Sequence, residues 1–198
     1  MPKFEPPQQI VMLTPFQEKK QRHYFKLLDY DRNNFIERDD FQAIAENLCI
    51  IQGIELDTIA YRQIEEASEK LWMDVREYID SNRDDRCSME EWLKFADEQI
   101  VNCDEVWYNN YINAVVVGLF NLFDANNDGL LSDLEYLDIF VSFRIEVRYA
   151  ARCFTKLDIN NDGYINKEEL VKAVSEFLRS DNPDDPGNWL FGDLGASN

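Results

Sequence analysis

The chain has 198 residues, of which 39 are acidic and 20 basic, so its formal net charge at pH 7 is −19. This negative charge argues against nucleic acid as a partner, because phosphate backbones are bound by basic surfaces. Hydrophobic residues make up 45% of the chain and aromatic residues 13%, a composition that can bury a core and that argues against intrinsic disorder.

The apolar runs and the cysteines bear on where the protein resides. The longest apolar run, 114–120, is far shorter than the roughly 20 residues that a membrane-spanning helix needs. We therefore expect no transmembrane segment. The sequence shows no secretory signal, and its cysteines have neither a CxxC pair nor a zinc spacing. A cytoplasmic protein with reduced thiols is the simplest interpretation.

The first half of the chain is predicted to be helical around two acidic loops. Thr14 can cap a helix, Pro15 suits its first turn and Gln17 completes a capping box. This helix should run to about residue 28, and further helices are predicted at 38–51, 57–79 and 89–101. The stretch 102–105 is the predicted boundary, so that residues 1–101 and 102–198 each form one pair of helix–loop–helix units.

The second half should begin with a helix at 107–123 that is apolar nearly all round. Such a helix is expected to be buried between neighbours. Helices at 133–144, 146–157 and 167–179 complete the prediction. The tail that follows carries Trp189, Leu190 and Phe191, which are too apolar for a free chain end. We expect these three side chains to dock in a cleft between the halves.

Two twelve-residue stretches of the second half, 124–135 and 158–169, repeat one pattern of oxygen-bearing side chains. A calcium ion takes six to eight oxygens at roughly 2.3 to 2.6 Å, and such a loop supplies them from places 1, 3, 5, 7 and 12. Gly129 and Gly163 occupy place 6, where the chain turns with a positive φ. The predicted ligands are Asp124, Asn126, Asp128, the carbonyl of Leu130 and Glu135 in one loop, and Asp158, Asn160, Asp162, the carbonyl of Tyr164 and Glu169 in the other.

The first half contains two less regular versions of this pattern, at 29–40 and 80–91. Asn34 and Asp85 replace the glycine at place 6, and Asp40 replaces the usual Glu at place 12 of the first loop. The alternative for both loops is a degenerate scaffold without an ion. The predicted ligands are Asp29, Asp31, Asn33, the carbonyl of Phe35 and Asp40, and then Asp80, Asn82, Asp84, the carbonyl of Arg86 and Glu91.

The loop sequences also predict the number of ions and the pairing of the loops. We expect three to four Ca²⁺ ions. Because Asp40 is one methylene shorter than Glu, the first site is expected to accept Mg²⁺ as well, which prefers six-coordination. Place 8 is apolar in the third and fourth loops, with Leu131 and Ile165, as expected if loops pair through a short antiparallel ribbon.

These features together resemble a known family. The four unevenly spaced loops, the Asp at place 12 of the first, the run LWMDVREYIDSNRDD before SMEEW and the terminal GNWLFG resemble the sarcoplasmic calcium-binding proteins and calexcitin, with calerythrin-like proteins close by. The resemblance spans nearly the whole chain. It implies an all-α fold in which four EF-hand helix–loop–helix units form two pairs in one compact globule, with the C-terminal tail docked. It also implies a cytosolic calcium buffer or a calcium-linked signalling protein.

Three classes of function follow from this interpretation. A calcium buffer is favoured, because the sequence has no P-loop, G-x-S-x-G, H-E-x-x-H or dinucleotide fingerprint that would indicate an enzyme. A sensor that regulates a target protein is the first alternative, although the four methionines are too few for an adaptable groove. A luciferin-binding or photoprotein-like protein is the second, with His23 as the only histidine for its cavity. The sequence identifies no protein target and does not tell whether a cavity holds an organic ligand.

Overall fold

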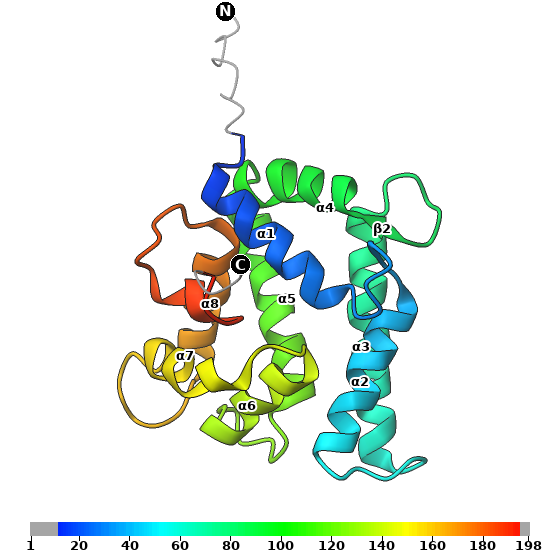
Figure 1. The fold of residues 1–198 in the computed structure, drawn as a ribbon, viewed down its shortest axis with the longest axis vertical. Helices are drawn as coiled ribbons and strands as arrows, with labels where there is room; N and C mark the ends of the chain where they lie inside the picture. Colours follow the sequence, from blue (N-terminus) through cyan, green and yellow to red (C-terminus); the bar gives the residue numbers. More distant parts are fainter. Residues whose placement is uncertain (1–11, 195–198) are drawn as a thin grey trace, which may run out of the picture.

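Helices separated by four acidic loops make up most of the computed structural model, which describes residues 12–194 (Figure 1). The first half contains α1 (Pro15–Leu28), α2 (Arg38–Ile51), α3 (Ile59–Ile79) and α4 (Met89–Phe95). The second half contains α5 (Glu105–Phe123), α6 (Asp133–Ser142), α7 (Ala150–Leu157) and α8 (Lys167–Arg179). The all-α architecture predicted from the sequence is therefore confirmed.

Side-chain caps decide where several helices begin. The Thr14 hydroxyl accepts a hydrogen bond from the Gln17 N–H and the Gln17 side-chain oxygen accepts one from the Thr14 N–H, which confirms the predicted capping box. Thr58 caps α3, so this helix begins at Ile59 and not at residue 57. Asp104 accepts the N–H groups of the first turn of α5, which moves that start from 107 to 105.

Three predicted helices differ from the structure in their regularity. The helix expected at 89–101 is α4 followed by a π-helical turn, η1 (Ala96–Val101). The one expected at 133–144 ends at Ser142, because Arg144 adopts a φ of 55° and the Ile145 N–H bonds back to the Phe140 carbonyl at 2.7 Å. The one expected at 146–157 starts as a 3-10 turn, η2 (Val147–Tyr149), before α7.

The loops pair as predicted. Strands β1 (Phe35–Ile36) and β2 (Cys87–Ser88) are antiparallel and place Ile36 opposite Cys87. In the second half, Leu131 and Ile165 exchange two backbone hydrogen bonds of 2.9 Å. All four of these place-8 residues are fully buried. Cys87 thus serves as a small hydrophobic residue in the ribbon, and burial raises the pKa of its thiol to about 12.

Helix α5 lies at the centre of the molecule and contacts α3, α6 and α8 (Figure 1). Its inner face is part of the core through Ile112, Val116 and Leu119. The expectation that α5 is buried all round is wrong, because Val106 and Val117 remain 72% and 45% exposed. The apolar composition of α5 therefore predicted more burial than the structure shows.

The tail docks, as predicted, through Leu190 and Phe191. It forms a short 3-10 turn, η3 (Pro186–Trp189), that packs on α7 and α8. The Phe191 ring stacks on Tyr24 of α1 at 4.9 Å and meets Phe177 of α8 edge-on at 5.1 Å. Trp189 is only partly buried, under the Arg152 guanidinium. The tail therefore lies between α1 of the first half and the helices of the second.

A buried lysine joins the same three segments. Lys20 of α1 is fully buried, and its ammonium donates to the carbonyls of Glu176 and Ser180 at 2.8 and 2.7 Å and to Asn188 Oδ1 at 3.0 Å. The two carbonyls lie at the C-terminal end of α8, where a positive charge is favoured by the helix dipole. Lys20 therefore links α1, the end of α8 and the docked tail.

Gly187 provides a test of tail docking. A Cβ at this position would collide with the Ala173 carbonyl and with Glu176 Cβ, both on α8. We expect Gly187→Ala to lower the free energy of unfolding by about 2 kcal/mol or more, the order of one large buried side chain. Truncation after Asp181 should act in the same direction and expose dye-binding surface. Thermal melting followed by circular dichroism measures both, with the exposed Asp184→Ala as control. An unchanged melting temperature in Gly187→Ala would contradict docking.

Candidate metal centres

The four loops have the same backbone shape although their sequences differ. The residues at place 6 are Asn34, Asp85, Gly129 and Gly163, and their φ angles are 70°, 65°, 80° and 87°. The positive φ that was predicted for the two glycines is thus adopted by an asparagine and an aspartate as well. This conformation is less favourable by roughly 1–2 kcal/mol for a residue with a Cβ. The first two loops therefore adopt the shape with a backbone penalty that the third and fourth do not have.

The aspartate at place 1 of each loop is fixed by backbone N–H groups. Its two carboxylate oxygens accept the N–H groups of places 5 and 6. The N–O distances are 3.0 and 3.0 Å at Asp29, 3.2 and 3.0 Å at Asp80, 3.1 and 2.9 Å at Asp124, and 3.1 and 3.0 Å at Asp158. The side-chain oxygen at place 3 also accepts the N–H of place 5, at 2.9, 2.9, 2.8 and 2.8 Å in chain order. Each loop therefore directs several oxygens towards its interior.

The carboxylate at place 12 closes each loop. One oxygen accepts the N–H of place 2 and the other accepts the N–H of place 9, which precedes the exiting helix. The distances are 2.8 and 2.7 Å at Asp40, 3.1 and 3.0 Å at Glu91, 3.0 and 2.9 Å at Glu135, and 2.9 and 3.0 Å at Glu169. The shorter Asp40 makes the same two contacts as the three glutamates.

The first loop brings three carboxylates together. One oxygen each of Asp29, Asp31 and Asp40 lies within 4.8 Å of the others. Burial raises the pKa of Asp29 and of Asp40, and the charge of Asp31 adds to both shifts. A cation would relieve this repulsion, and a set of donors made only of oxygen suits the hard ions Ca²⁺ and Mg²⁺. The residues present therefore fit a divalent ion.

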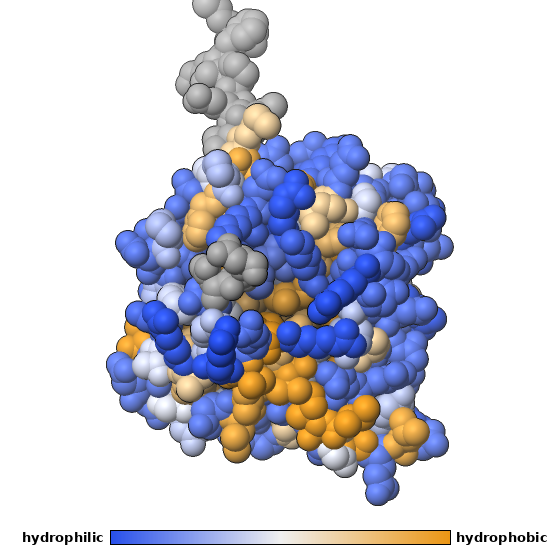
Figure 2. Space-filling view, viewed as in Figure 1, coloured by the Kyte–Doolittle hydropathy of each residue, from blue (hydrophilic) through white to orange (hydrophobic). Residues whose placement is uncertain are grey.

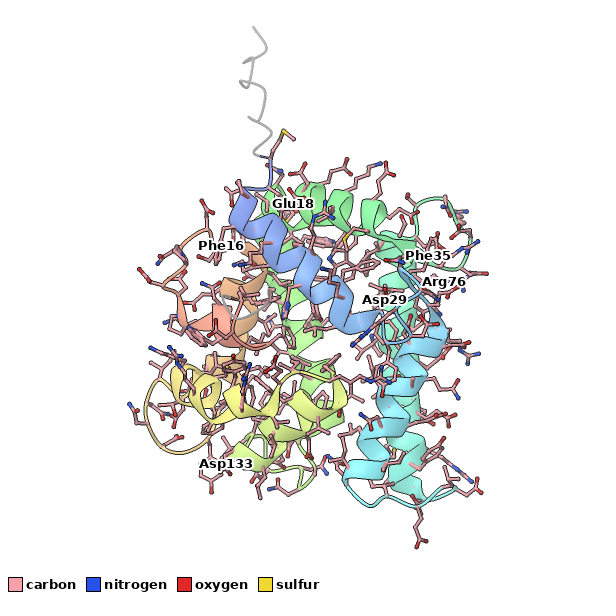
Figure 3. The ribbon with its side chains drawn as sticks, viewed as in Figure 1. Phe16, Glu18, Asp29, Phe35, Arg76 and Asp133 are labelled. Carbon is pink, nitrogen blue, oxygen red and sulfur yellow. The ribbon has the colours of Figure 1, made fainter. Side chains whose placement is uncertain are left out.

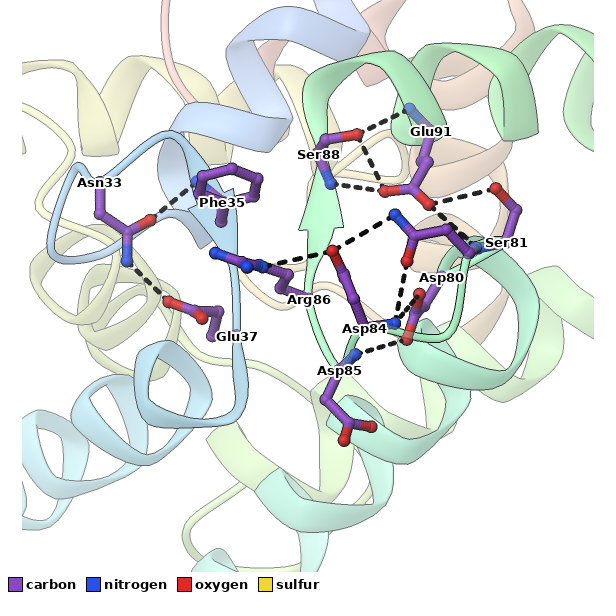
Figure 4. A network of polar contacts seen from close by, with 11 residues as sticks. Asn33, Phe35, Glu37, Asp80, Ser81, Asp84, Asp85, Arg86, Ser88 and Glu91 are labelled. Carbon is purple, nitrogen blue, oxygen red and sulfur yellow. Dashed lines mark hydrogen bonds and ion pairs between the residues drawn. The ribbon is translucent and has the colours of Figure 1, made fainter.

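The second loop differs from the others because arginine side chains pair with its acidic residues, as Figure 4 shows for Arg86 and Asp84. The Arg86 guanidinium lies 3.3 Å from the expected ligand Asp84 and also covers the Phe35 ring at 4.8 Å. Arg76 of α3 pairs with Asp85 at 2.6 Å. Both pairs are largely exposed, so each is worth little in stability. The Arg86 guanidinium nevertheless places a positive charge on one oxygen of the expected ligand Asp84.

The closing carboxylate of the second loop has more donors than its counterparts. Glu91 accepts hydrogen bonds from the hydroxyls of Ser81 and Ser88 in addition to backbone N–H groups. Burial by itself would raise the pKa of Glu91, but these hydrogen bonds outweigh it and the pKa lies below its ordinary value. The loop thus holds its carboxylate in the ionised form that binds cations.

The structure places every residue of the four predicted ligand sets in its loop, and the two loop pairs lie apart from each other. Figure 3 shows Asp29 and Phe35 near Arg76 on one side of the molecule and Asp133, at the start of α6, away from them. The arginine side chains of the second loop were not anticipated. The sequence does contain an indication of the Arg86 contact, because Arg86 lies two residues after the predicted ligand Asp84. The EF-hand pattern considers only the backbone carbonyl at place 7, so the Arg86 side chain was overlooked.

His23, considered as a cavity residue, has a different role. Its Nε2 atom lies 2.9 Å from the Phe191 carbonyl, so it contacts the docked tail. Burial lowers the pKa of His23, which favours the neutral ring. His23 is not among the residues that line the cavity bounded by α1 to α5. It is therefore a packing residue beside the docked tail.

A comparison with known families bears on three of these loops, the first, third and fourth. The family model "EF hand" matches residues 22–45, 116–141 and 150–175. Calerythrin from Saccharopolyspora erythraea is 23% identical over 84% of this chain and 94% of its own length, and calexcitin-1 from Caenorhabditis elegans is 25% identical over 91% and 88%.

A solved structure extends the similarity to the fold. The sarcoplasmic calcium-binding protein from amphioxus superimposes with a TM-score of 0.68 at 22% identity, over 91% of this chain and 98% of that one. In the part of the chain that the structure describes, no helix is long and apolar enough to cross a bilayer. The chain therefore contains EF-hand units and is similar over most of its length to the sarcoplasmic calcium-binding proteins, calexcitin and calerythrin.

Proposed function

We propose that this protein binds calcium ions in its four loops and serves as a cytosolic calcium buffer or in calcium-linked signalling. The observation that carries the proposal is the carboxylate at place 12, which every loop holds by the same two N–H groups. With it, the oxygens of places 1, 3 and 5 and the carbonyl of place 7 are the proposed ligands. An ion bound there supplies no chemistry beyond its charge, so we propose a binding protein and no enzyme.

The third and fourth loops should bind most tightly. Both have glycine at place 6, where it adopts the positive φ without a Cβ clash, and both have a glutamate at place 12. The first loop has the close carboxylates of Asp29, Asp31 and Asp40, together with Glu37 at place 9. Its charge and its shorter closing residue suit a site shared by Ca²⁺ and Mg²⁺. The second loop should bind most weakly, because Arg86 competes for Asp84.

The packing favours a buffer over a sensor that opens. The halves proposed at residues 1–101 and 102–198 are joined by the tail, which Tyr136 holds through a 2.9 Å hydrogen bond to the Leu190 carbonyl. A sensor exposes a groove when calcium binds. In this protein, opening such a groove would expose the buried side chains of Leu190 and Phe191. This exposure would cost roughly 1.5–3 kcal/mol per side chain.

One feature supports the sensor as a second candidate. Ile50, Leu56 and Ile59, at the turn between α2 and α3, are 78%, 72% and 78% exposed. Figure 2 shows a mainly hydrophilic face with an apolar area in its lower part. Exposed apolar patches mark interaction sites when they are contiguous. Binding of an apolar dye with and without calcium separates the two candidates, since a buffer should show little change.

Removing one closing carboxylate should remove one site. We expect Glu135→Gln and Glu169→Gln each to lower the number of tightly bound calcium ions by one, because each deletes an anionic bidentate ligand. Native mass spectrometry at micromolar free calcium counts the ions. Glu168→Gln is the matched control, since it neutralises the neighbouring residue at place 11. Unchanged stoichiometry in both ligand variants would refute the assignment.

The second loop should bind calcium more tightly when Arg86 loses its charge. Arg86→Gln keeps most of the side chain over Phe35 and removes the guanidinium from Asp84. We expect an affinity gain of about three- to tenfold at this loop, the order of one weak ion pair or hydrogen bond. Arg76→Gln is the control, because it removes the same charge from Asp85, which is not a ligand. Site-resolved NMR titration measures both, and equal gains would point to a general charge effect.

Magnesium should compete most strongly at the first loop. At millimolar Mg²⁺ we expect the apparent calcium affinity of residues 29–40 to fall more than that of 124–135 or 158–169, because six-coordination suits Mg²⁺ and the shorter Asp40. NMR titration of calcium with and without magnesium resolves the loops. Displacement of calcium from the third and fourth loops, with the first spared, would reverse the proposed order.

A further inference from the structure

A cavity of about 430 Å³ lies inside the helical body, apart from the four loops. Its walls come from five of the helices, α1 to α5, and from Phe143, the residue that follows α6. Figure 1 shows α1 and α5 crossing the centre of the molecule beside the column of α2 and α3. The walls are mostly aromatic and aliphatic, with Phe41, Leu48, Trp92, Phe95 and Leu122 among them. Pockets for small organic molecules usually occupy about 300–1,000 Å³ and have walls of this kind.

Two half-buried tyrosines of this cavity have hydroxyls without a protein partner, and a third tyrosine, Tyr78, lies at its exposed edge. Tyr24 of α1 and Tyr111 of α5 both line it, and neither hydroxyl makes a hydrogen bond to any residue in the range 12–194. Burial raises the pKa of Tyr24 to about 12 and that of Tyr111 well above its ordinary value, with a further contribution from Tyr24. Both phenols are therefore neutral at pH 7 and can donate a hydrogen bond into the cavity.

The two fully buried tyrosines, Tyr108 and Tyr136, have protein partners for their hydroxyls. The Tyr108 hydroxyl bonds Ser175, and the Tyr136 hydroxyl donates to the Leu190 carbonyl at 2.9 Å. Neither of these two lines the cavity. Fully buried polar groups are normally hydrogen-bonded within the protein. The half-buried phenols of Tyr24 and Tyr111 instead keep their hydroxyls available to a partner inside the cavity.

The rings that carry these hydroxyls are held firmly. Tyr111 stacks on Trp107 at 5.3 Å with an interplanar angle of 7°, and it meets Phe95 edge-on at 5.7 Å. Tyr24 is fixed by Trp92 at 5.5 Å and by the tail residue Phe191. Donors on rigid aromatic supports are preorganised for a ligand, because little side-chain entropy is lost on binding.

Charged groups are confined to one edge of the cavity, which marks its opening. Lys70 and Asp74 of α3 pair at 2.7 Å there, with 70% and 39% of their side chains exposed. Asn110 and Ala114 of α5 are exposed on the same rim. The lining contains no other charged side chain. A charged ligand would therefore find no counter-ion inside.

We infer that this cavity is a binding site for a neutral aromatic molecule with a carbonyl or similar acceptor, to which the Tyr24 and Tyr111 hydroxyls donate. The aromatic walls receive the rings of the ligand and the two phenols orient its acceptor. The site is separate from calcium binding, since no residue of the four ligand sets lines it.

A matched pair of probes tests the inference on the full chain loaded with calcium. The first is 6-propionyl-2-(dimethylamino)naphthalene, a neutral aromatic ketone. The second is its 6-propyl analogue, which lacks the carbonyl. Isothermal titration calorimetry should show saturable binding of one ketone molecule per chain, and weaker binding of the analogue. Calcium stoichiometry is measured separately, so that a failure of this site and a failure of the calcium proposal are distinguished.

Three variants locate the bound probe. Tyr24→Phe and Tyr111→Phe keep the rings and should each weaken ketone binding by about three- to tenfold, the value of one hydrogen bond, while leaving the analogue nearly unchanged. Ala114→Trp, at the exposed rim, should weaken both probes by narrowing the opening. Tyr149→Phe, outside the cavity, should have no effect. Thermal melting checks that each variant is folded.

Two outcomes would overturn the inference. Absence of saturable ketone binding to the unaltered chain would mean that the cavity takes water only. Binding that is indifferent to both tyrosine variants and to Ala114→Trp would place the probe elsewhere on the protein. A loss in Ala114→Trp without any loss in the tyrosine variants would overturn the assignment of the two donors.

Discussion

The hydrogen bonds of the closing carboxylate hold each EF-hand unit together. In the fourth loop, Glu169 accepts N–H groups from Ile159, near the entering helix, and from Asn166, which caps the exiting helix. One side chain thereby fixes the start of the loop, its end and the direction of the next helix. Because the same group is a proposed ligand, an ion bound there acts on helix geometry directly. The ribbon between paired loops then transmits this geometry from one unit to its partner.

A second set of contacts joins the two halves. Lys20 bonds carbonyls at the end of α8, and Phe191 fills the space between Tyr24 and Phe177. These contacts bury an ammonium group together with aromatic rings, an arrangement that is stable only when each donor has an acceptor. The three acceptors of Lys20 meet that condition. Opening the body would break all of them together, which is consistent with a protein that binds calcium without a large change of shape.

The loops and the cavity obey different physical constraints. The loops are built from local hydrogen bonds between residues at most ten positions apart, as in Ile159 to Glu169. They keep their shape even where Asn34 or Asp85 replaces glycine. The cavity is bounded by helices from both halves, so its volume depends on how the helices pack. Calcium binding and ligand binding would therefore respond to different substitutions.

The sequence by itself determined the loops, their predicted ligand positions, the capping box of α1 and the docking of Leu190 and Phe191. These features depend on spacing within a few residues or on strong apolarity, which a sequence displays directly. Only the tertiary structure decided the exposed face of α5, the Arg86 contact with Asp84, the buried role of Lys20 and the cavity with Tyr24 and Tyr111. The contacts of Lys20 join residues up to 168 positions apart, and a cavity is space that packing leaves unfilled, so neither has a local pattern that a sequence could show.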